Sequence, residues 1–336
     1  MTRTSRFQLL ATLPFAIALL GSSGACAQSA AAAAPTPTEL VDALNGVFGQ
    51  HPGFRAVHAK GIVLEGQFTP DASASAITKA AHLQDKTVPV VVRFSNFAGV
   101  PDLADNHGLA SPHGLAVKFS LPDGTHTDIV AHSFNGFPSA NTTDFHQLLI
   151  ALAASGPDAA KPTALDTYLG THPVAKAFLT AAKPAPASYA TLPYFGVNTF
   201  KFTNVQGGST FVRYQFKPMA GAHALTDAQA AAATSNYLSD EIRQRVKQAP
   251  VAFKLLAQIA EPGDKVEDPS IAWPDSRRTV ELGTLRVTQV VPDSDAAQKK
   301  LSFMPNALTS GIEVGDPMIN PRSAAYPVSL SRRSKQ

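Results

Sequence analysis

The sequence predicts an α+β fold with a large antiparallel sheet or barrel. Three observations predict this class. Short β-rich runs, separated by Pro, Asp, Gly and Asn, occupy much of residues 62–130. Segments with apolar residues at helical spacing come mainly after them, and one further β-rich run follows near residue 284. Strands that are grouped together before helices favour an α+β arrangement.

The first 27 residues predict a cleavable secretory signal peptide. A positive start precedes an apolar stretch from Phe7 to Leu20, which is too short to span a bilayer, and a small-residue end. Ala25-Cys26-Ala27 fits the small-x-small cleavage rule, so we expect cleavage after Ala27 and a periplasmic mature protein. A lipoprotein signal is disfavoured, because Ser23 stands where such signals carry an apolar residue.

The composition of the mature chain argues against several classes of protein. Removal of residues 1–27 leaves 309 residues and lowers the formal net charge from +3 to +1. A nearly neutral chain gives no electrostatic reason to expect nucleic acid or an anionic membrane as a partner. The only cysteine, Cys26, is lost with the signal, which excludes a disulfide framework and a Cys-bound metal. A chain of this length can bury a large core without such cross-links.

Residues 28–37 predict a flexible lead, rich in Ala and Pro, and residues 38–336 predict the folded domain. A capping box, Thr36-Pro37-Thr38-Glu39, predicts the start of the first helix, and apolar residues at helical spacing follow it. A Pro- and Ala-rich passage at 182–190 predicts a loop.

The remaining elements follow from the spacing of apolar residues. Strands are predicted at 62–68, 88–94, 115–120, 199–203, 211–216 and 284–290. Helices are predicted at 142–154, from a second capping box at Thr226 towards Lys247, at 251–260, and briefly around 324–326.

Four segments carry polar residues within or beside these apolar strands. They are Arg55–Gly61, Val90–Gly99, Ser111–Phe119 and Thr127–Phe137. A charge such as Arg93 in a buried-looking strand normally needs a partner, whereas a lone histidine at a strand start is usually structural. The chain has no phosphate-binding glycine loop, no Gly-x-Ser-x-Gly elbow and no His-x-x-x-His spacing. A paired zinc site on one helix is therefore not expected.

Taken in order, these segments resemble the catalase superfamily patterns R-x-x-H-A-x-G, V-R-F-S-x-x-A-G, P-R-G-x-A-V-K-F and D-L-V-G-N-N. The match continues in Asn198–Asn204, Phe303–Glu313 and Arg322–Pro327, and it covers roughly residues 45–335. The compact length is similar to the catalase-related peroxidase branch. The resemblance implies a catalase-like fold, an antiparallel β-barrel with surrounding and C-terminal helices. It also implies one haem b (iron protoporphyrin IX) as cofactor.

The resemblance implies a role for each matching residue. Tyr326 matches the proximal iron ligand, and Arg322, four residues earlier, would lie beside its phenolate. His58 matches the distal histidine, which moves a proton between the two peroxide oxygens. Ser95 matches the serine that orients this histidine, although a serine in a strand also commonly bonds to its own backbone.

Further matches concern residues that contact the propionates and the face of the haem in the family. Arg55, Arg93 and Arg333 match the three arginines that bind the haem propionates, and arginine suits bidentate pairing with carboxylates. Phe145 matches the aromatic residue that packs on the haem face, although a plain core phenylalanine is an equal alternative.

Departures from the family pattern bear on the catalase step, in which a second peroxide is oxidised. His132 stands at the position of the distal asparagine, and Asn135, three residues later, is the alternative source of an amide. Other departures are Phe97, Ser111, His113, Gln215 and Leu330. These changes leave haem binding expected but disfavour fast catalase turnover.

We therefore expect a peroxidase that reduces hydrogen peroxide or an organic hydroperoxide with small electron donors and protects against oxidative stress. A true catalase and a fatty-acid hydroperoxide rearranging enzyme are the enzymatic alternatives. A non-catalytic periplasmic haem-binding protein is the alternative from another class, and the presence of both His58 and Tyr326 disfavours it. A monomer or dimer is expected.

Overall fold

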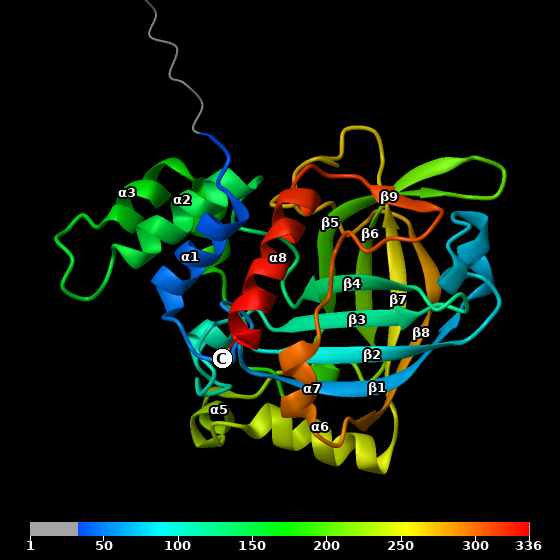
Figure 1. The fold of residues 1–336 in the computed structure, drawn as a ribbon, viewed down its shortest axis with the longest axis horizontal. Coiled ribbons are helices and arrows are strands. Elements are labelled where there is room, and N and C mark those ends of the chain that lie inside the picture. The colour runs from blue at the N-terminus through cyan, green and yellow to red at the C-terminus, as the bar shows by residue number, and fades with distance from the viewer. Residues whose placement is uncertain (1–32, 336) are drawn as a thin grey trace, which may run out of the picture. The chain divides into compact units, whose positions relative to one another are not determined.

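A large antiparallel sheet, closed into a barrel, forms the centre of the protein in a computed structural model that describes residues 33–335 (Figure 1). The sheet order is β4-β3-β2-β1-β8-β7-β6-β5-β9. The strands are β1 Gly61–Pro70, β2 Val88–Ser95, β3 Gly114–Ser120, β4 His126–His132, β5 Tyr194–Thr203, β6 Ser209–Pro218, β7 Val251–Ile259, β8 Thr279–Val290 and β9 Ile312–Val314. The α+β fold with an antiparallel barrel is thus confirmed.

The barrel closes where β4 meets β5. Strands β1 to β8 form a continuous ring because His132 on β4 pairs with Phe195 on β5, while β9 adds to the outer side of this junction by pairing with β5. Closure removes the free strand edges that an open sheet would present. The seam of the barrel therefore contains one of the predicted site residues, His132.

Eight helices lie outside the barrel within the described residues. They are α1 Pro37–Phe48, α2 Thr142–Ala153, α3 Ala164–Thr171, α4 Pro173–Thr180, α5 Asp227–Ala232, α6 Tyr237–Gln248, α7 Ser294–Lys300 and α8 Ile319–Ser334. Helix α1 packs against both α2 and α8, and α7 packs against β1 and α8 (Figure 1). No helix among residues 33–335 is long and apolar enough to cross a membrane.

The barrel interior is filled by large apolar side chains. Inward positions alternate with outward ones, as in β7, where Val251, Phe253, Leu255 and Ala257 are buried and the residues between them are partly exposed. Rings stack inside the barrel, where Phe94 and Tyr189 lie nearly parallel with their ring centroids 5.3 Å apart. This core needs no cross-link, as expected for a chain of this length.

Most sequence expectations for individual elements are confirmed, including the Thr36 capping box and the six strands. The expected helix at 251–260 is wrong, because this segment is strand β7. Its Ala, Leu, Lys and Gln residues favour helix locally, but the alternating apolar residues decide the structure once neighbouring strands pair with them. The helix expected from Thr226 to Lys247 is two helices, α5 and α6. The expected signal peptide lies outside the described residues.

Candidate functional site

A cavity lies between one end of the barrel and helices α1 and α8. Its space not filled by atoms is about 810 Å³, including its open mouth. Residues of β2, β3 and β4 form one wall, and Val41 and Leu44 of α1 and Ala325, Tyr326 and Ser329 of α8 form others. Its lining combines many apolar side chains with arginine, histidine, serine and tyrosine side chains, as is typical of sites for organic ligands.

His58 lines the cavity in a strained backbone conformation. Its φ of 57° lies in the left-handed region, which residues other than glycine adopt at a cost. Two backbone bonds hold this conformation: the His58 N–H donates to the Phe97 carbonyl (2.7 Å), and the His58 carbonyl accepts from Arg93 Nη2 (2.9 Å). The ring also packs edge-on against Phe97, 5.5 Å away. The imidazole is therefore fixed in place by its surroundings.

The proton of His58 is fixed as well. Nδ1 lies 3.0 Å from the Asn96 carbonyl oxygen and 3.1 Å from Ser95 Oγ. Because a carbonyl oxygen can only accept, neutral His58 carries its proton on Nδ1. Nε2 keeps its lone pair and makes no hydrogen bond to residues 33–335. Burial lowers the pKa of His58 to about 3, with a further contribution from the charge of Arg93, so the ring is neutral near pH 7.

A glycine makes this arrangement possible. Gly114 of β3 pairs with Ser95, and a Cβ at position 114 would lie 2.5 Å from Ser95 Oγ and 2.9 Å from His58 Nδ1. Such distances are well inside van der Waals contact, so any larger residue would displace the serine or the imidazole. The glycine in the Ser111–Phe119 segment is thus explained by close approach.

Behind His58, Asn96 connects the site to a buried polar network. Its Nδ2 donates to Asp105 Oδ1 (2.8 Å), and its Oδ1 accepts from Tyr189 Oη (2.8 Å). Asp105 also forms an ion pair with Lys60 (2.7 Å). Every member of this network has a partner, and such satisfied networks rigidify the surrounding core. The network therefore holds the Asn96 carbonyl that orients His58.

Tyr326 lies on α8 and faces the same cavity. Arg322 Nε donates to Tyr326 Oη over 3.0 Å, as expected for residues four apart on a helix. Arg322 Nη1 donates to Asn198 Oδ1 (2.7 Å), and Asn198 Nδ2 donates in turn to Asp316 Oδ2 (2.9 Å). These bonds fix the position of the Tyr326 oxygen, which faces the cavity.

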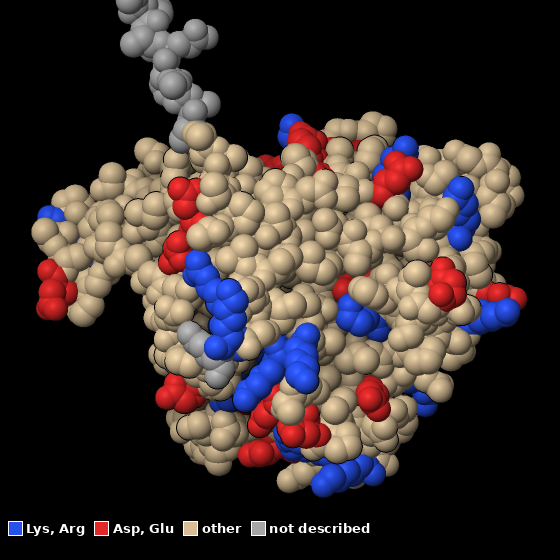
Figure 2. Space-filling view, viewed as in Figure 1, with Lys and Arg blue, Asp and Glu red and all other residues tan. Residues whose placement is uncertain are grey.

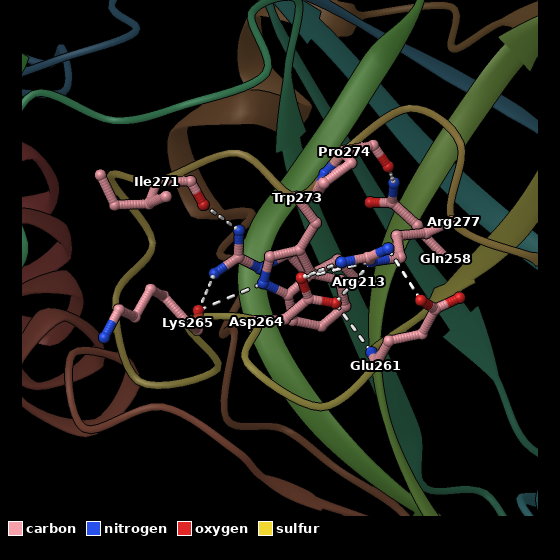
Figure 3. Close-up of polar contacts among 9 residues, drawn as sticks. All are labelled: Arg213, Gln258, Glu261, Asp264, Lys265, Ile271, Trp273, Pro274 and Arg277. Atoms are coloured by element: carbon pink, nitrogen blue, oxygen red, sulfur yellow. Dashed lines mark hydrogen bonds and ion pairs between the residues drawn. The ribbon is translucent and has the colours of Figure 1, made fainter.

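Arg213 of β6 lies beside this chain of hydrogen bonds, and Figure 3 shows its guanidinium bonded to the loop that contains Lys265 and Ile271. Its Nε donates to Thr199 Oγ1 (3.1 Å), next to Asn198. Nη1 and Nη2 donate to the backbone carbonyls of Ile271 (2.6 Å) and Lys265 (3.0 Å), and the guanidinium lies 4.4 Å from the Trp273 ring centroid. Arg213 therefore joins the loop between β7 and β8 to the strand that supports Arg322.

Three arginines meet at one side of the cavity, although they are far apart in the sequence. Arg55, Arg93 and Arg333 all line it. Arg55 Nη2 and Arg333 Nη2 both donate to the Leu301 carbonyl, at 2.6 and 2.8 Å. Loss of hydration, and then the charges of Arg93 and Arg333, lower the pKa of Arg55 well below its usual value. Within residues 33–335 none of the three pairs with a carboxylate, so this wall of the cavity suits an anionic group.

His132 lies at the barrel seam and has two unpaired ring nitrogens. Both are buried, and neither has a hydrogen-bond partner within the described residues. Burial lowers the pKa of His132 to about 3, with contributions from Arg322 and Lys183. His132 is close enough to His58 for its charge to affect the pKa of that residue, yet it does not line the cavity. Asn135, the alternative source of an amide, does not line the cavity either.

The structure separates some predicted residues from the cavity. Phe145 of α2 packs against Phe137, with ring centroids 5.1 Å apart, and is absent from the cavity lining. His113 bonds instead to Asn96 Oδ1 through Nδ1 (3.2 Å) and lies within 3.4 Å of Ser111 Oγ. These contacts place His113 in the network behind His58, where sequence motifs alone gave it no role.

Several residues that shape the site were not found by sequence reasoning. The carbonyls of Asn96 and Leu301 act through the backbone, and backbone acceptors carry no residue-type signal. Gln298, which accepts from Arg93 Nη2 (3.0 Å), comes from a helix that no pattern predicted. Asp316 could have been noticed, since it is a lone acidic residue six positions before Arg322.

Comparison with known proteins gives consistent results. The profile of the family described as Catalase matches residues 49–334. A catalase-related peroxidase of Mycolicibacterium paratuberculosis is 37% identical over 303 residues, which cover 89% of this chain and 95% of the relative. A catalase-related peroxidase of Synechococcus elongatus is 32% identical over 322 residues, or 94% of each chain. A solved structure of a bacterial catalase aligns with a TM-score of 0.73 at 21% identity, over 84% of this chain and 58% of its own, which supports the fold.

Proposed function

The chain belongs to the catalase family, and on that premise we propose how its own residues carry out peroxide chemistry. It is an oxidoreductase of the catalase superfamily that acts on peroxide with haem. We propose more specifically that the haem is haem b. We also propose that hydrogen peroxide or an organic hydroperoxide is reduced by small electron donors, so that the protein protects against oxidative stress.

The residues around the cavity fit a haem group. Arg55, Arg93 and Arg333 offer guanidinium groups without a carboxylate partner in the described chain, as two propionates require. Tyr326 offers a phenolic oxygen that accepts from Arg322 Nε, and tyrosine is the iron ligand of catalases. No cluster of three His, Cys, Asp or Glu residues within 33–335 offers another metal site. We therefore propose Tyr326 as the iron ligand and the three arginines as propionate partners.

When bound, haem would supply the redox chemistry of peroxide cleavage. The proposed task of His58 is to move one proton. Nε2 accepts a proton from one peroxide oxygen and returns it to the other, so that the departing oxygen leaves as water. The Asn96 carbonyl and Ser95 Oγ keep the Nδ1 proton in place throughout. Since burial lowers the pKa of His58 to about 3, Nε2 is available as a base at neutral pH.

The remaining predicted residues have smaller proposed roles. His132, with both ring nitrogens unpaired and buried, is proposed to act on the peroxide side in place of the family's asparagine. Phe145 is proposed to support the haem face through Phe137, with which it packs. We propose that donor oxidation dominates oxygen release, because an imidazole at position 132 cannot offer the amide that helps to hold a second peroxide in the family.

One observation carries the proposal: His58, with a free Nε2, and Tyr326, bonded to Arg322, line the same cavity. The test is an absorption spectrum of the purified haem-loaded protein, followed by addition of peroxide with and without guaiacol. We expect a tyrosinate-ligated ferric spectrum and guaiacol oxidation that exceeds oxygen release. A protein that retains no haem, or that releases oxygen as its main product, contradicts the proposal.

Location and assembly are proposed from the sequence. The signal-like residues 1–27 support a periplasmic mature protein, and we propose a monomer or dimer. Mass spectrometry of the protein from a periplasmic extract should give a chain that begins at Gln28. Cytoplasmic recovery of the uncleaved chain contradicts this location.

A further inference from the structure

Two adjacent backbone carbonyls hold His58 in its strained conformation. The Phe97 carbonyl accepts from the His58 backbone N–H (2.7 Å), and the Asn96 carbonyl accepts from Nδ1 of the ring (3.0 Å). A φ of 57° persists at a residue with a side chain only where its surroundings fix it. The direction of His58 Nε2 therefore depends on what fixes Asn96 and Phe97.

The Asn96 side chain ties this segment to the core of the barrel. Its backbone N–H donates to the Lys60 carbonyl (3.0 Å), and the next N–H donates to the Ala110 carbonyl (2.8 Å). Both of these carbonyls lie outside the strands. The Asn96 side chain is instead buried beside Tyr189, whose ring is fully buried in the core. The amide of Asn96 is thus a link between the carbonyls that hold His58 and the rigid interior of the fold.

Asp105 fixes the donor end of this amide. Figure 2 shows acidic side chains at the surface of one face of the molecule, whereas Asp105 is one of three acidic residues that are buried within residues 33–335. It forms an ion pair with Lys60 (2.7 Å), its Oδ1 accepts from Asn96 Nδ2 (2.8 Å), and its Oδ2 accepts from the Leu238 N–H (2.9 Å). Because an ionised carboxylate can only accept, the NH₂ group of Asn96 must face it.

Two donors fix the other end of the amide. Tyr189 Oη donates to Asn96 Oδ1 over 2.8 Å, and His113 Nδ1 lies 3.2 Å from the same oxygen. Burial raises the pKa of Tyr189 well above its usual value and lowers the pKa of His113 to about 4, so the phenol keeps its proton at neutral pH and the imidazole is uncharged. An inverted amide would place its oxygen against the Asp105 carboxylate, where no hydrogen bond forms. The Asn96 side chain therefore has one favoured orientation.

We propose that Asp105 and Tyr189 are positioning residues of peroxide reduction, which act through the Asn96 amide to direct His58 Nε2 at the peroxide. This proposal rests on the proposed peroxidase function. Neither Asp105 nor Tyr189 lines the cavity, so neither touches the peroxide or the haem proposed to bind there. The network moves no proton itself. It keeps the carbonyl that accepts from His58 Nδ1 in the place that aims Nε2 into the cavity.

Asp105→Asn and Tyr189→Phe test the two ends of the amide by stopped-flow absorption of the haem-loaded protein. Asp105→Asn allows Asn96 to invert, and we expect its reaction with hydrogen peroxide to be about ten- to a hundredfold slower, the order expected when a reacting group is misplaced by roughly 1 Å. Tyr189→Phe keeps the buried ring and removes one donor, so the rate should fall by about three- to tenfold. A native rate in Tyr189→Phe overturns the proposal, even if Asp105→Asn does not fold.

Tyr194→Phe is the matched control. Tyr194 is as fully buried as Tyr189, but its hydroxyl donates to the Tyr189 backbone carbonyl (2.9 Å) and not to Asn96. This variant also loses one buried hydrogen bond, and it should react with hydrogen peroxide at the native rate. A loss of rate equal to that of Tyr189→Phe would show that any such loss slows the reaction, and would overturn the proposal.

The same substitutions in His58→Ala distinguish positioning from a general structural role. A residue that acts through His58 has nothing to position in that variant, so neither Asp105→Asn nor Tyr189→Phe should slow the remaining reaction further. Equal slowing with and without His58 would show that the two residues support the fold alone, and would overturn the proposal.

A measurement on the haem-free protein separates this proposal from the proposed function. Nitrogen NMR of the labelled histidine ring locates the proton of His58, which should lie on Nδ1 in the native chain and be shared with Nε2 in Asp105→Asn and Tyr189→Phe. If this pattern is found but the haem-loaded native protein does not react with peroxide, the positioning of His58 stands and the peroxidase function fails. If the native protein reduces peroxide while the proton and the rate are unchanged in both variants, the positioning role is overturned and the function stands.

Discussion

Two arginines in this protein, Arg213 and Arg55, differ in how completely their donors are used. Arg213 is 3% exposed, and its guanidinium bonds to Thr199 and to three backbone carbonyls, with Trp273 against its face. Arg55 makes one hydrogen bond, to the Leu301 carbonyl, within the described residues, and it faces a cavity. A buried donor without a partner costs free energy, so a protein retains it only where a ligand completes the bonds. The difference separates a structural arginine from one that we propose binds an anion.

The same distinction exists inside one side chain. His58 Nδ1 is bonded to the Asn96 carbonyl, and behind that carbonyl lies a network in which Asp105, Lys60 and Tyr189 all have partners. His58 Nε2 has no partner within residues 33–335 and faces the cavity. The bonded atom keeps the ring in place, and the free atom is the one that can react.

The largest expected effect concerns the free atom of His58. His58→Ala should leave haem bound through Tyr326 but slow the reaction with peroxide by about a hundred- to ten-thousand-fold, because proton transfer by a positioned group contributes that much. Stopped-flow absorption after mixing with peroxide measures this rate. Ser95→Ala is the control for position, with a smaller effect, because the Asn96 carbonyl still holds Nδ1. A rate near that of the native protein in His58→Ala would remove the catalytic role.

In contrast to His58→Ala, Arg213→Met should lower the stability of the folded protein. The substitution keeps the stem but removes the guanidinium from the carbonyls of Lys265, Asp268 and Ile271, and it leaves the Ile271 carbonyl without a donor. We expect the free energy of unfolding of the haem-free protein to fall by about 3–5 kcal/mol. Denaturant unfolding measures the change, with exposed Arg286→Met as the control. A change below 1 kcal/mol would contradict the distinction between Arg213 and Arg55.

Arg55→Gln should weaken haem binding with little change in stability. Because Arg55 makes one bond to the chain, the free energy of unfolding of the haem-free protein should change by no more than about 1 kcal/mol. Haem affinity should fall about tenfold, the effect of losing one charge-assisted hydrogen bond of roughly 1.5 kcal/mol. Haem titration into the haem-free protein measures it. A large loss of stability with unchanged haem affinity would show that Arg55, like Arg213, has a structural role.

An unpaired buried group does not always mark a ligand site. The two ring nitrogens of His82 are unpaired within the described residues, but His82 faces no described cavity. It packs between Phe68 and Phe119, and burial lowers its pKa to about 3. The unfolded chain binds a proton near pH 6.5 and the folded chain does not, so stability present above pH 6.5 is lost as the pH falls towards 3. Lowering the pH from 7 to 5 should therefore reduce the free energy of unfolding by about 2 kcal/mol through this one residue.

Unfolding of His82→Leu at pH 7 and pH 5 tests this value. The loss of stability on acidification should be smaller than in the native chain by about 2 kcal/mol, whereas exposed His126→Leu should behave like the native chain. Equal acid sensitivity in His82→Leu and the native chain would show that His82 is not buried as a neutral ring.

The sequence predicted the parts of this protein that depend on local pattern. β-rich runs separated by Pro, Asp, Gly and Asn predicted strands β1, β2 and β3, and the spacing of four between Arg322 and Tyr326 predicted their contact on a helix. Segment 251–259 failed because its residue types favour helix, while pairing with β6 and β8 makes it a strand. Long-range pairing of this kind leaves only the weak trace of alternation in the chain itself.

The site was less accessible to such reasoning than the fold. The side chains that bear the chemistry follow motifs, but the groups that hold them are backbone carbonyls of Asn96 and Leu301 and the amide of Asn198. Their roles arise from where the folded chain places them, not from residue type. Phe145, which the motif placed on the haem, lies against Phe137 and outside the cavity lining.

The measurement that tests the central claim most directly is haem titration into haem-free Tyr326→Phe, followed by its ferric absorption spectrum. Phenylalanine preserves the ring and the packing on α8 but removes the oxygen that accepts from Arg322 Nε. If Tyr326 is the iron ligand, the variant should fold with native stability. It should also lose haem, or bind it with an altered ferric spectrum. Unchanged haem affinity together with an unchanged spectrum would contradict the assignment of this cavity as a tyrosinate-ligated haem site.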